Sequence, residues 1–230
     1  QRGPILLTDQ FSAKTEGRGR VEVYSVLPGI DASYMTILAP QIDFHHAATC
    51  SVLELFYCRS GRVGWNMQGG SATYLGAGDL AIHGAAYCAD SAMMFPPGYA
   101  EGIAVALDLP TLAQSCPAVL QETGIDFQQM ERNFCERGPR TVSACPQLDR
   151  IFMPLFLAKP DRRGAYLQLK VQELLLYLME LDPEPKAATQ YFSQQTERVK
   201  EIHRQMTRHL ERRYTIEELS KQYLINTSTL

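Results

Sequence analysis

The side chains best suited to bind a metal or to act as nucleophiles in this 230-residue chain are six cysteines and five histidines. The cysteines form no CxxC pair and are too sparse for a disulfide scaffold, which also excludes zinc fingers of the usual spacing. We therefore expect most of them to be small buried apolar residues. The sequence has no GxSxG, P-loop or HExxH motif, and no GxGxxG that a helix follows. We accordingly expect no catalytic residues and no enzymatic activity.

Composition places the chain among ordinary globular proteins. It is 45% hydrophobic and 20% charged, with a net charge of −3, too apolar and too weakly charged for a disordered protein. No apolar run approaches the roughly 20 residues of a membrane span, and the first residues do not resemble a signal peptide. We expect a cytoplasmic protein with no membrane partner.

The charge is unevenly distributed along the chain. Residues 1–185 carry 14 Lys and Arg against 20 Asp and Glu, a net charge of −6, whereas residues 186–230 carry 8 against 5, a net charge of +3. A basic C-terminal segment on an acidic body indicates that this segment meets a polyanion.

Short strands with turn signals between them dominate the first hundred or so residues. The expected strands are 21–27, 34–39, 50–58, 62–67, 72–75, 79–83 and 103–109. Turns are marked by pairs such as Ser60-Gly61 and Gly69-Gly70 and by Pro96-Pro97-Gly98. This rhythm predicts a sandwich, a barrel or a jelly roll.

Helices are expected after Leu109. The candidates are 112–121, 127–135, 147–158 with an interruption at Pro154, 162–181, and a further helix from Thr196 to about Arg212. Within 162–181 an apolar stripe recurs at helical spacing, formed by Leu167, Val171, Leu174, Leu175 and Leu178. The spacing fits an intramolecular contact and a dimer seam equally well.

Two prolines and a run of small and polar residues between Asp182 and Gln195 mark a linker. We divide the chain into a β unit at 1–110, a helical segment at 111–181, the linker at 182–195 and a C-terminal unit at 196–230.

The C-terminal unit contains a capping box, Thr215-Ile216-Glu217-Glu218. The helix that starts there has Leu219 and Tyr223 on its buried face and the small Ser220 where a second helix can approach. A turn at 224–226 follows, and Asn226 or Thr227 can cap the next helix. This pattern is that of a helix-turn-helix, and a helical hairpin without a nucleic-acid role is the alternative.

The residues of this unit carry a resemblance over about 32 positions. The stretches 199–206, 209–211, 214–221 and 225–230 resemble the start of the DNA-binding domain of the AraC/XylS family of bacterial transcription regulators. The resemblance implies that promoter DNA is a partner, that Thr227, Ser228 and Thr229 lie at the start of a DNA-reading helix, and that an activator would also contact RNA polymerase. The family domain runs about seventy residues further, so we expect the 230-residue chain by itself not to bind an operator specifically.

The β half resembles the cupin-like sensor half of the same regulators, in the stretches 50–62, 74–80 and 95–103. The resemblance implies an α+β fold: an N-terminal cupin-like β-barrel or jelly roll, a helical dimerisation segment and a partial all-α helix-turn-helix domain. It further implies a small-molecule effector in the barrel and a homodimer, to which we assign Leu167, Val171, Leu174 and Leu178.

Cupins are also metalloenzymes, but the metal pattern of cupins is not kept here. Glu54 and Gly61 keep its frame, whereas the expected histidine positions hold Thr49, Cys50 and Ala81. His45 and His46 lie too far upstream of Glu54 to replace them. One carboxylate does not make a metal site, so we expect no metal and no cofactor.

If Glu54 faces the barrel interior as in a cupin, side-chain alternation also points Phe56 and Cys58 inward, with Ala81 and His83 on a later strand. We assign effector binding to Glu54, Phe56, Cys58, Trp65 and His83. A salt bridge to an arginine for Glu54 and an ordinary core position for His83 are the alternatives.

These observations favour a ligand-responsive AraC-type transcription regulator, with activation as the expected sign. A cupin-type metalloenzyme and a regulator whose barrel only dimerises are the competing hypotheses.

Overall fold

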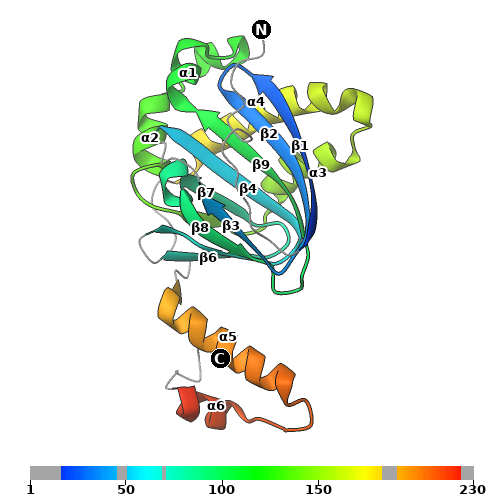
Figure 1. Cartoon of the computed structure of the whole chain (residues 1–230). Helices are drawn as coiled ribbons and strands as arrows, with labels where there is room; N and C mark the ends of the chain where they lie inside the picture. Colours follow the sequence, from blue (N-terminus) through cyan, green and yellow to red (C-terminus); the bar gives the residue numbers. More distant parts are fainter. Residues whose placement is uncertain (1–16, 46–50, 69–70, 183–190, 224–230) are drawn as a thin grey trace.

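The computed structural model describes residues 17–45, 51–68, 71–182 and 191–223. Two antiparallel sheets form its N-terminal part, and Figure 1 shows the larger sheet with helices α3 and α4 behind it. The larger sheet has the strand order β1 (Arg18–Leu27), β2 (Ile30–Leu38), β9 (Ala100–Asp108), β4 (Val52–Gly61), β7 (Leu80–Gly84) and β10 (Arg140–Val142). The smaller sheet has the order β11 (Tyr191–Phe192), β6 (Ser71–Leu75), β5 (Val63–Asn66), β8 (Asp90–Met94) and β3 (Gln41–His45).

The helices follow the strands in sequence. They are α1 (Leu109–Gln114), α2 (Phe127–Phe134), α3 (Pro146–Leu157), α4 (Arg163–Glu180), α5 (Ser193–Arg208) and α6 (Ile216–Tyr223), with short 3-10 turns η2 (Ala85–Tyr87), η3 (Ala118–Thr123) and η4 (Pro160–Arg162). The predicted α+β class is confirmed: an antiparallel β-sandwich comes first and helices follow. None of these helices, in the part of the chain that is described, has both the length and the apolar character that crossing a bilayer demands.

Strand β4 separates two apolar cores because its side chains alternate between the faces of the larger sheet. On one face Leu53, Leu55 and Tyr57 pack with the helices. On the other face Phe56 and Cys58 lie between the two sheets. The inner core also contains Ile37, Phe44, Val63, Trp65, Met67, Leu75, Ala81, Cys88, Met93 and Phe95.

Gly102 on β9 makes room for this inner core. A methyl group at Gly102 would lie 2.6 Å from Cζ of Phe56 and would also meet the carbonyl oxygen of Tyr57. A glycine is therefore required where Phe56 crosses the neighbouring strand.

Each of the seven predicted strands has a counterpart in the structure, with shifted ends, and the structure adds β3, β8, β10 and β11 to them. The single helix expected at 112–121 is wrong. The chain instead forms α1, which ends at Gln114, and the 3-10 turn η3, which starts after Pro117. Pro117 has no N–H to continue the helix.

The expected interruption of α3 at Pro154 is also wrong, because α3 runs through that residue to Leu157. Pro154 cannot donate to the carbonyl of Arg150, four residues earlier in the helix. Lys170 of α4 supplies the missing donor, with its Nζ atom 2.8 Å from that carbonyl oxygen. A contact between helices thus replaces the bond that the proline removes.

The apolar stripe of α4 makes an intramolecular contact, which was one of the two alternatives left open by its spacing. Leu167, Val171, Leu174 and Leu178 are each at most 2% exposed and belong to the core between the larger sheet and the helices. The assignment of these four residues to a dimer surface is therefore corrected, because their side chains are already covered by the chain's own sheet and helices.

Helix α6 begins where the sequence predicts. Oγ1 of Thr215 accepts from the backbone N–H of Glu218 at 3.1 Å, and the Glu218 carboxylate accepts from the N–H of Thr215 at 3.2 Å. This reciprocal pair is the predicted capping box. Helix α5 begins at Ser193, inside the stretch expected to be linker.

Candidate functional site

A polar cluster lies among aromatic rings between the two sheets, whose shared interior we call the barrel interior. Glu54 and His83 are opposite each other on the paired strands β4 and β7, so their side chains share the inner face. Cys88 follows η2 and reaches the same place, with Sγ donating to Oε2 of Glu54 at 2.8 Å. Nδ1 of His83 is 4.0 Å from the same carboxylate oxygen and 3.3 Å from the carbonyl oxygen of Gly84.

Trp65, the only tryptophan, is at the centre of the aromatic rings. Its ring is nearly perpendicular to the His83 imidazole, with the two ring centroids 4.7 Å apart. The ring centroids of Phe56 and Phe44 lie 6.4 and 6.0 Å from that of Trp65. The indole N–H donates to Oγ of Ser91 at 3.0 Å. Tryptophan fluorescence therefore reports directly on this cluster.

Ser91 links the tryptophan to the cysteine. Its hydroxyl donates to the backbone carbonyl of Cys88 at 2.9 Å, and the backbone N–H of Cys88 donates to the carbonyl of Ala85 at 3.2 Å. These bonds fix the turn that carries the thiol.

The cluster is buried, and Glu54 is its more exposed member. The side chain of His83 is fully buried, whereas that of Glu54 is 21% exposed. Burial raises the pKa of the Cys88 thiol far above its usual range, and the charge of Glu54 and the hydrogen bond to it act in the same direction. The thiol is therefore protonated near neutral pH and is a hydrogen-bond donor rather than a nucleophile.

Cys58 lies in the same inner core without joining the cluster. Burial, and then the charge of Asp79, raise its pKa to about 11, and its thiol donates to the carbonyl of Ser60 at 3.6 Å. The structure thus brings Glu54, Phe56, Trp65 and His83 together and places Cys58 apart from the polar group.

Sequence reasoning missed Cys88 and Ser91 as site residues. Cys88 is 34 positions from Glu54, and the 3-10 turn that presents it carries no strong sequence signal. The arginine partner considered for Glu54 is replaced by a thiol and an imidazole. Of the positions in the cupin metal pattern, Glu54 belongs to this cluster, whereas Ala81 is apolar and Thr49 and Cys50 lie outside the described residues.

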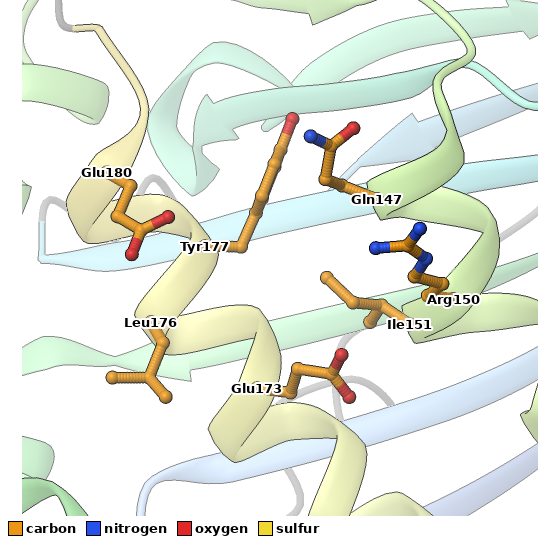
Figure 2. Close-up of a pocket in the computed structure, with 7 residues that line it drawn as sticks. All are labelled: Gln147, Arg150, Ile151, Glu173, Leu176, Tyr177 and Glu180. Carbon is orange, nitrogen blue, oxygen red and sulfur yellow. The ribbon is translucent and has the colours of Figure 1, made fainter.

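A groove of about 180 Å³ lies on the outside of the molecule, between α3 and α4. Figure 2 shows its lining side chains, Gln147, Arg150 and Ile151 from α3 and Glu173, Leu176, Tyr177 and Glu180 from α4. It is smaller than the roughly 300 Å³ at which small-molecule sites begin. We place the candidate site at the interior cluster because a carboxylate, an imidazole and a thiol converge there beside aromatic rings.

The two C-terminal helices, α5 and α6, pack against each other through a small apolar cluster. Ile202 of α5 packs against Leu219 of α6, and both are buried, with Tyr214 and Tyr223 beside them. Gln205 accepts from Gln222 at 3.2 Å and also from the hydroxyl of Tyr223. The predicted DNA-contacting residues Thr227, Ser228 and Thr229 lie outside the described residues.

Comparison with known proteins finds no matching family model and no matching curated protein. Among solved structures, the AraC-like transcriptional activator CuxR is similar at 12% identity and a TM-score of 0.44, over 92% of this chain and 72% of that one. A Cupin 2 conserved barrel domain protein from Salinispora arenicola is 15% identical, with a TM-score of 0.34 over 50% of this chain and 96% of its own.

A third similar structure is the Cupin 2 domain of an XRE family transcriptional regulator from Enterobacter cloacae, at 12% identity and a TM-score of 0.33 over 39% of this chain and 95% of that one. The chain is thus similar, at low identity, to an AraC-like regulator and to cupin domains.

Proposed function

We propose that this protein is a ligand-responsive transcription regulator of the AraC type, in which the barrel senses a small effector and promoter DNA is bound by a domain of which α5 and α6 are the first helices. The observation that carries the proposal is the capped helix pair: α6 starts at the Thr215 capping box and packs on α5 through Ile202 and Leu219. This is the geometry expected of the first half of a helix-turn-helix.

The charges of this segment support DNA as the partner. Arg208, Arg212, Arg213 and Lys221 are exposed on and between the two helices. Lysine and arginine side chains that neutralise phosphates supply most of the affinity for a duplex, whereas base contacts supply its specificity. Thr227, Ser228 and Thr229 remain our assignment for the start of the base-reading helix.

Ligand sensing is supported by the polar cluster inside the barrel. A carboxylate, an imidazole and a thiol among aromatic rings offer the few oriented polar groups that small-molecule sites use. Strand β4 carries Glu54 and Phe56 into this site and Leu55 and Tyr57 into the core beneath the helices. A ligand that prefers one arrangement of β4 would thus favour one arrangement of the helices, up to the difference of its affinities.

Homodimerisation is the third part of the proposal, with a surface that differs from the predicted one. Opposite its buried stripe, α4 exposes Leu169 and Leu176, one heptad apart, together with Tyr166 and Met179. Exposed apolar residues gathered on one face commonly mark a protein interface. We assign the dimer contact to this outward face.

Immunoprecipitation of the protein with its chromosomal DNA from its own cells tests the proposal. We expect a few enriched promoter regions that share one sequence motif. Leu219→Asp, which places a charge between α5 and α6, should abolish the enrichment, and Leu157→Asp, at an exposed position at the end of α3, should retain it. Uniform DNA recovery with the unaltered protein would refute the proposal.

A further inference from the structure

The interior cluster holds three different metal-ligating groups from three separate places in the chain. One ligand atom each from Glu54, His83 and Cys88 lies within 4.8 Å of the other two, the one such group found in the described residues. Strand pairing fixes the first two, and the turn after η2 fixes the third. The three donors are a carboxylate oxygen, an imidazole nitrogen and a sulfur.

We propose that Glu54, His83 and Cys88 bind one Zn²⁺ ion inside the barrel and leave a fourth coordination position open. Zinc is held in proteins by this mixture of sulfur, nitrogen and oxygen ligands, whereas Ca²⁺ and Mg²⁺ take oxygen ligands. The proposal goes beyond the proposed function, since it holds whether or not the protein binds DNA.

The distances between the donors suit a small tetrahedral ion. Zinc bonds of about 2.0–2.3 Å separate neighbouring tetrahedral ligands by about 3.3–3.8 Å. The thiol and the carboxylate oxygen are now 2.8 Å apart, and the carboxylate oxygen and Nδ1 of His83 are 4.0 Å apart. These values lie on either side of the required range, so side-chain shifts of about an ångström complete the set.

The surroundings hold the donors in place. The Trp65 ring, nearly perpendicular to the His83 imidazole with the ring centroids 4.7 Å apart, restricts that imidazole. The hydrogen bond from Ser91 to the Cys88 carbonyl restricts the turn. Supporting contacts of this kind commonly orient metal ligands and tune the affinity of the site.

Access to the site is through the carboxylate. His83 and Cys88 are almost completely buried, and Glu54 is the partly exposed ligand. Three protein ligands with one position toward an opening are typical of zinc sites that bind a further molecule, whereas structural zinc sites have four protein ligands. The fourth position would be taken by water or by an anionic or thiol-bearing effector.

Binding exchanges bonds without a redox step. The S–H bond of Cys88 breaks, its proton passes to solvent, and the thiolate sulfur bonds to zinc. Glu54 loses the hydrogen bond from the thiol and gains a bond to the ion. His83 binds through Nδ1 as the neutral tautomer with its proton on Nε2, so Nδ1 donates no hydrogen bond to the Gly84 carbonyl in the bound state. No oxidant, reductant or other reactant is needed.

Metal titration of the untagged, metal-free chain tests the proposal. Zn²⁺ is added in competition with a chromophoric chelator, and Co²⁺ is added separately to detect thiolate-to-cobalt charge-transfer absorption. We expect one equivalent of either ion to bind, with a change in Trp65 fluorescence and, for cobalt, the charge-transfer band. Zinc should also raise the thermal unfolding midpoint.

Variants locate the site. Cys88→Ser should remove the charge-transfer band, and Cys88→Ser, His83→Gln and Glu54→Gln should each weaken zinc binding at least tenfold. Cys58→Ser removes another buried thiol of the same core and should retain full binding. Circular dichroism shows which metal-free variants are folded. If Cys88→Ser or His83→Gln is not folded, Cys88→Ala or His83→Asn replaces it. No stoichiometric binding to the unaltered chain, or equal binding to folded Cys88→Ser, would overturn the proposal.

Discussion

Two residues of strand β4 show how burial decides what a side chain can do. The Tyr57 ring stacks on Phe152 at 4.4 Å, and its hydroxyl donates to Asp149 at 3.1 Å. One position later in the strand, Cys58 faces the opposite core and is fully buried. The neighbours thus belong to different cores and have different roles.

The thiol of Cys58 should be unreactive near neutral pH. With its pKa raised to about 11 by burial, only about one thiol in a thousand is ionised at pH 8. We expect slow alkylation of Cys58 at pH 8 and faster alkylation of the half-exposed Cys116, followed peptide by peptide with mass spectrometry. The alkylation rate at Cys58 should rise as the pH approaches 11. Equal alkylation rates at Cys58 and Cys116 at pH 8 would contradict the buried environment of Cys58.

Removing the Tyr57 hydroxyl should cost little stability compared with removing the ring. Tyr57→Phe loses one hydrogen bond and keeps the stack on Phe152, which lowers the free energy of unfolding by about 1 kcal/mol. Tyr57→Ala also leaves a cavity and lowers it by about 3–5 kcal/mol. Urea unfolding measures both values, and similar losses would show that the ring does not carry the contact between sheet and helices.

At the scale of elements, the capping box of α6 is the clearest local signal in the chain. Thr215→Ala removes the acceptor for the Glu218 N–H and should destabilise α6 by about 1 kcal/mol. Thr215→Ser keeps that acceptor and should behave like the unaltered chain. Hydrogen exchange of the α6 amides distinguishes the variants, and unchanged protection in Thr215→Ala would mean that tertiary packing alone holds the helix.

Local patterns predicted the elements that local physics determines. The buried stripe of α4, the capping box and the alternation of β4 depend on spacing within one segment, and all three are present. Strands β3 and β8 were missed, and they pair with each other across a wide separation in the sequence, from Gln41 opposite Met94 to His45 opposite Asp90. The Glu54–Cys88 contact was missed as well, since strand pairing and η2 together create it.

In helix α3, by contrast, a contact with another helix decides the outcome. Pro154 is a sound reason to expect a break, and the helix continues because Lys170, sixteen residues further along the chain, donates to the carbonyl that the proline leaves without its helical partner. The tertiary contact thus overrides the tendency of proline to break a helix, and the sequence of α3 alone could not predict that contact.

At the scale of the whole molecule, the larger sheet is shared by the candidate site and the helices. Arg163 at the start of α4 pairs with Glu22 of β1 at 2.8 Å, and the Tyr34 hydroxyl of β2 donates to the Leu155 carbonyl of α3 at 3.0 Å. The helices are therefore held to the sheet whose inner face carries Glu54 and His83.

The outward face of α4 should control the oligomeric state. Leu169→Glu places a charge at the centre of the proposed dimer contact and should convert a dimer to a monomer, because an unpaired buried charge is costly. Leu210→Glu changes an even more exposed apolar residue away from α4 and should leave the mass unchanged. Size-exclusion chromatography with light scattering gives the mass, and a Leu169→Glu protein that stays dimeric would place the contact elsewhere.

Control of transcription from the barrel interior is the central claim, and promoter output measures it most directly. Transcription from a promoter enriched with the protein is compared across growth conditions for the unaltered protein, Glu54→Gln and the exposed-site control Glu180→Gln. We predict that output varies with conditions for the unaltered protein and the control, and that this variation is lost in Glu54→Gln. Equal variation in all three proteins would contradict a sensor site at Glu54.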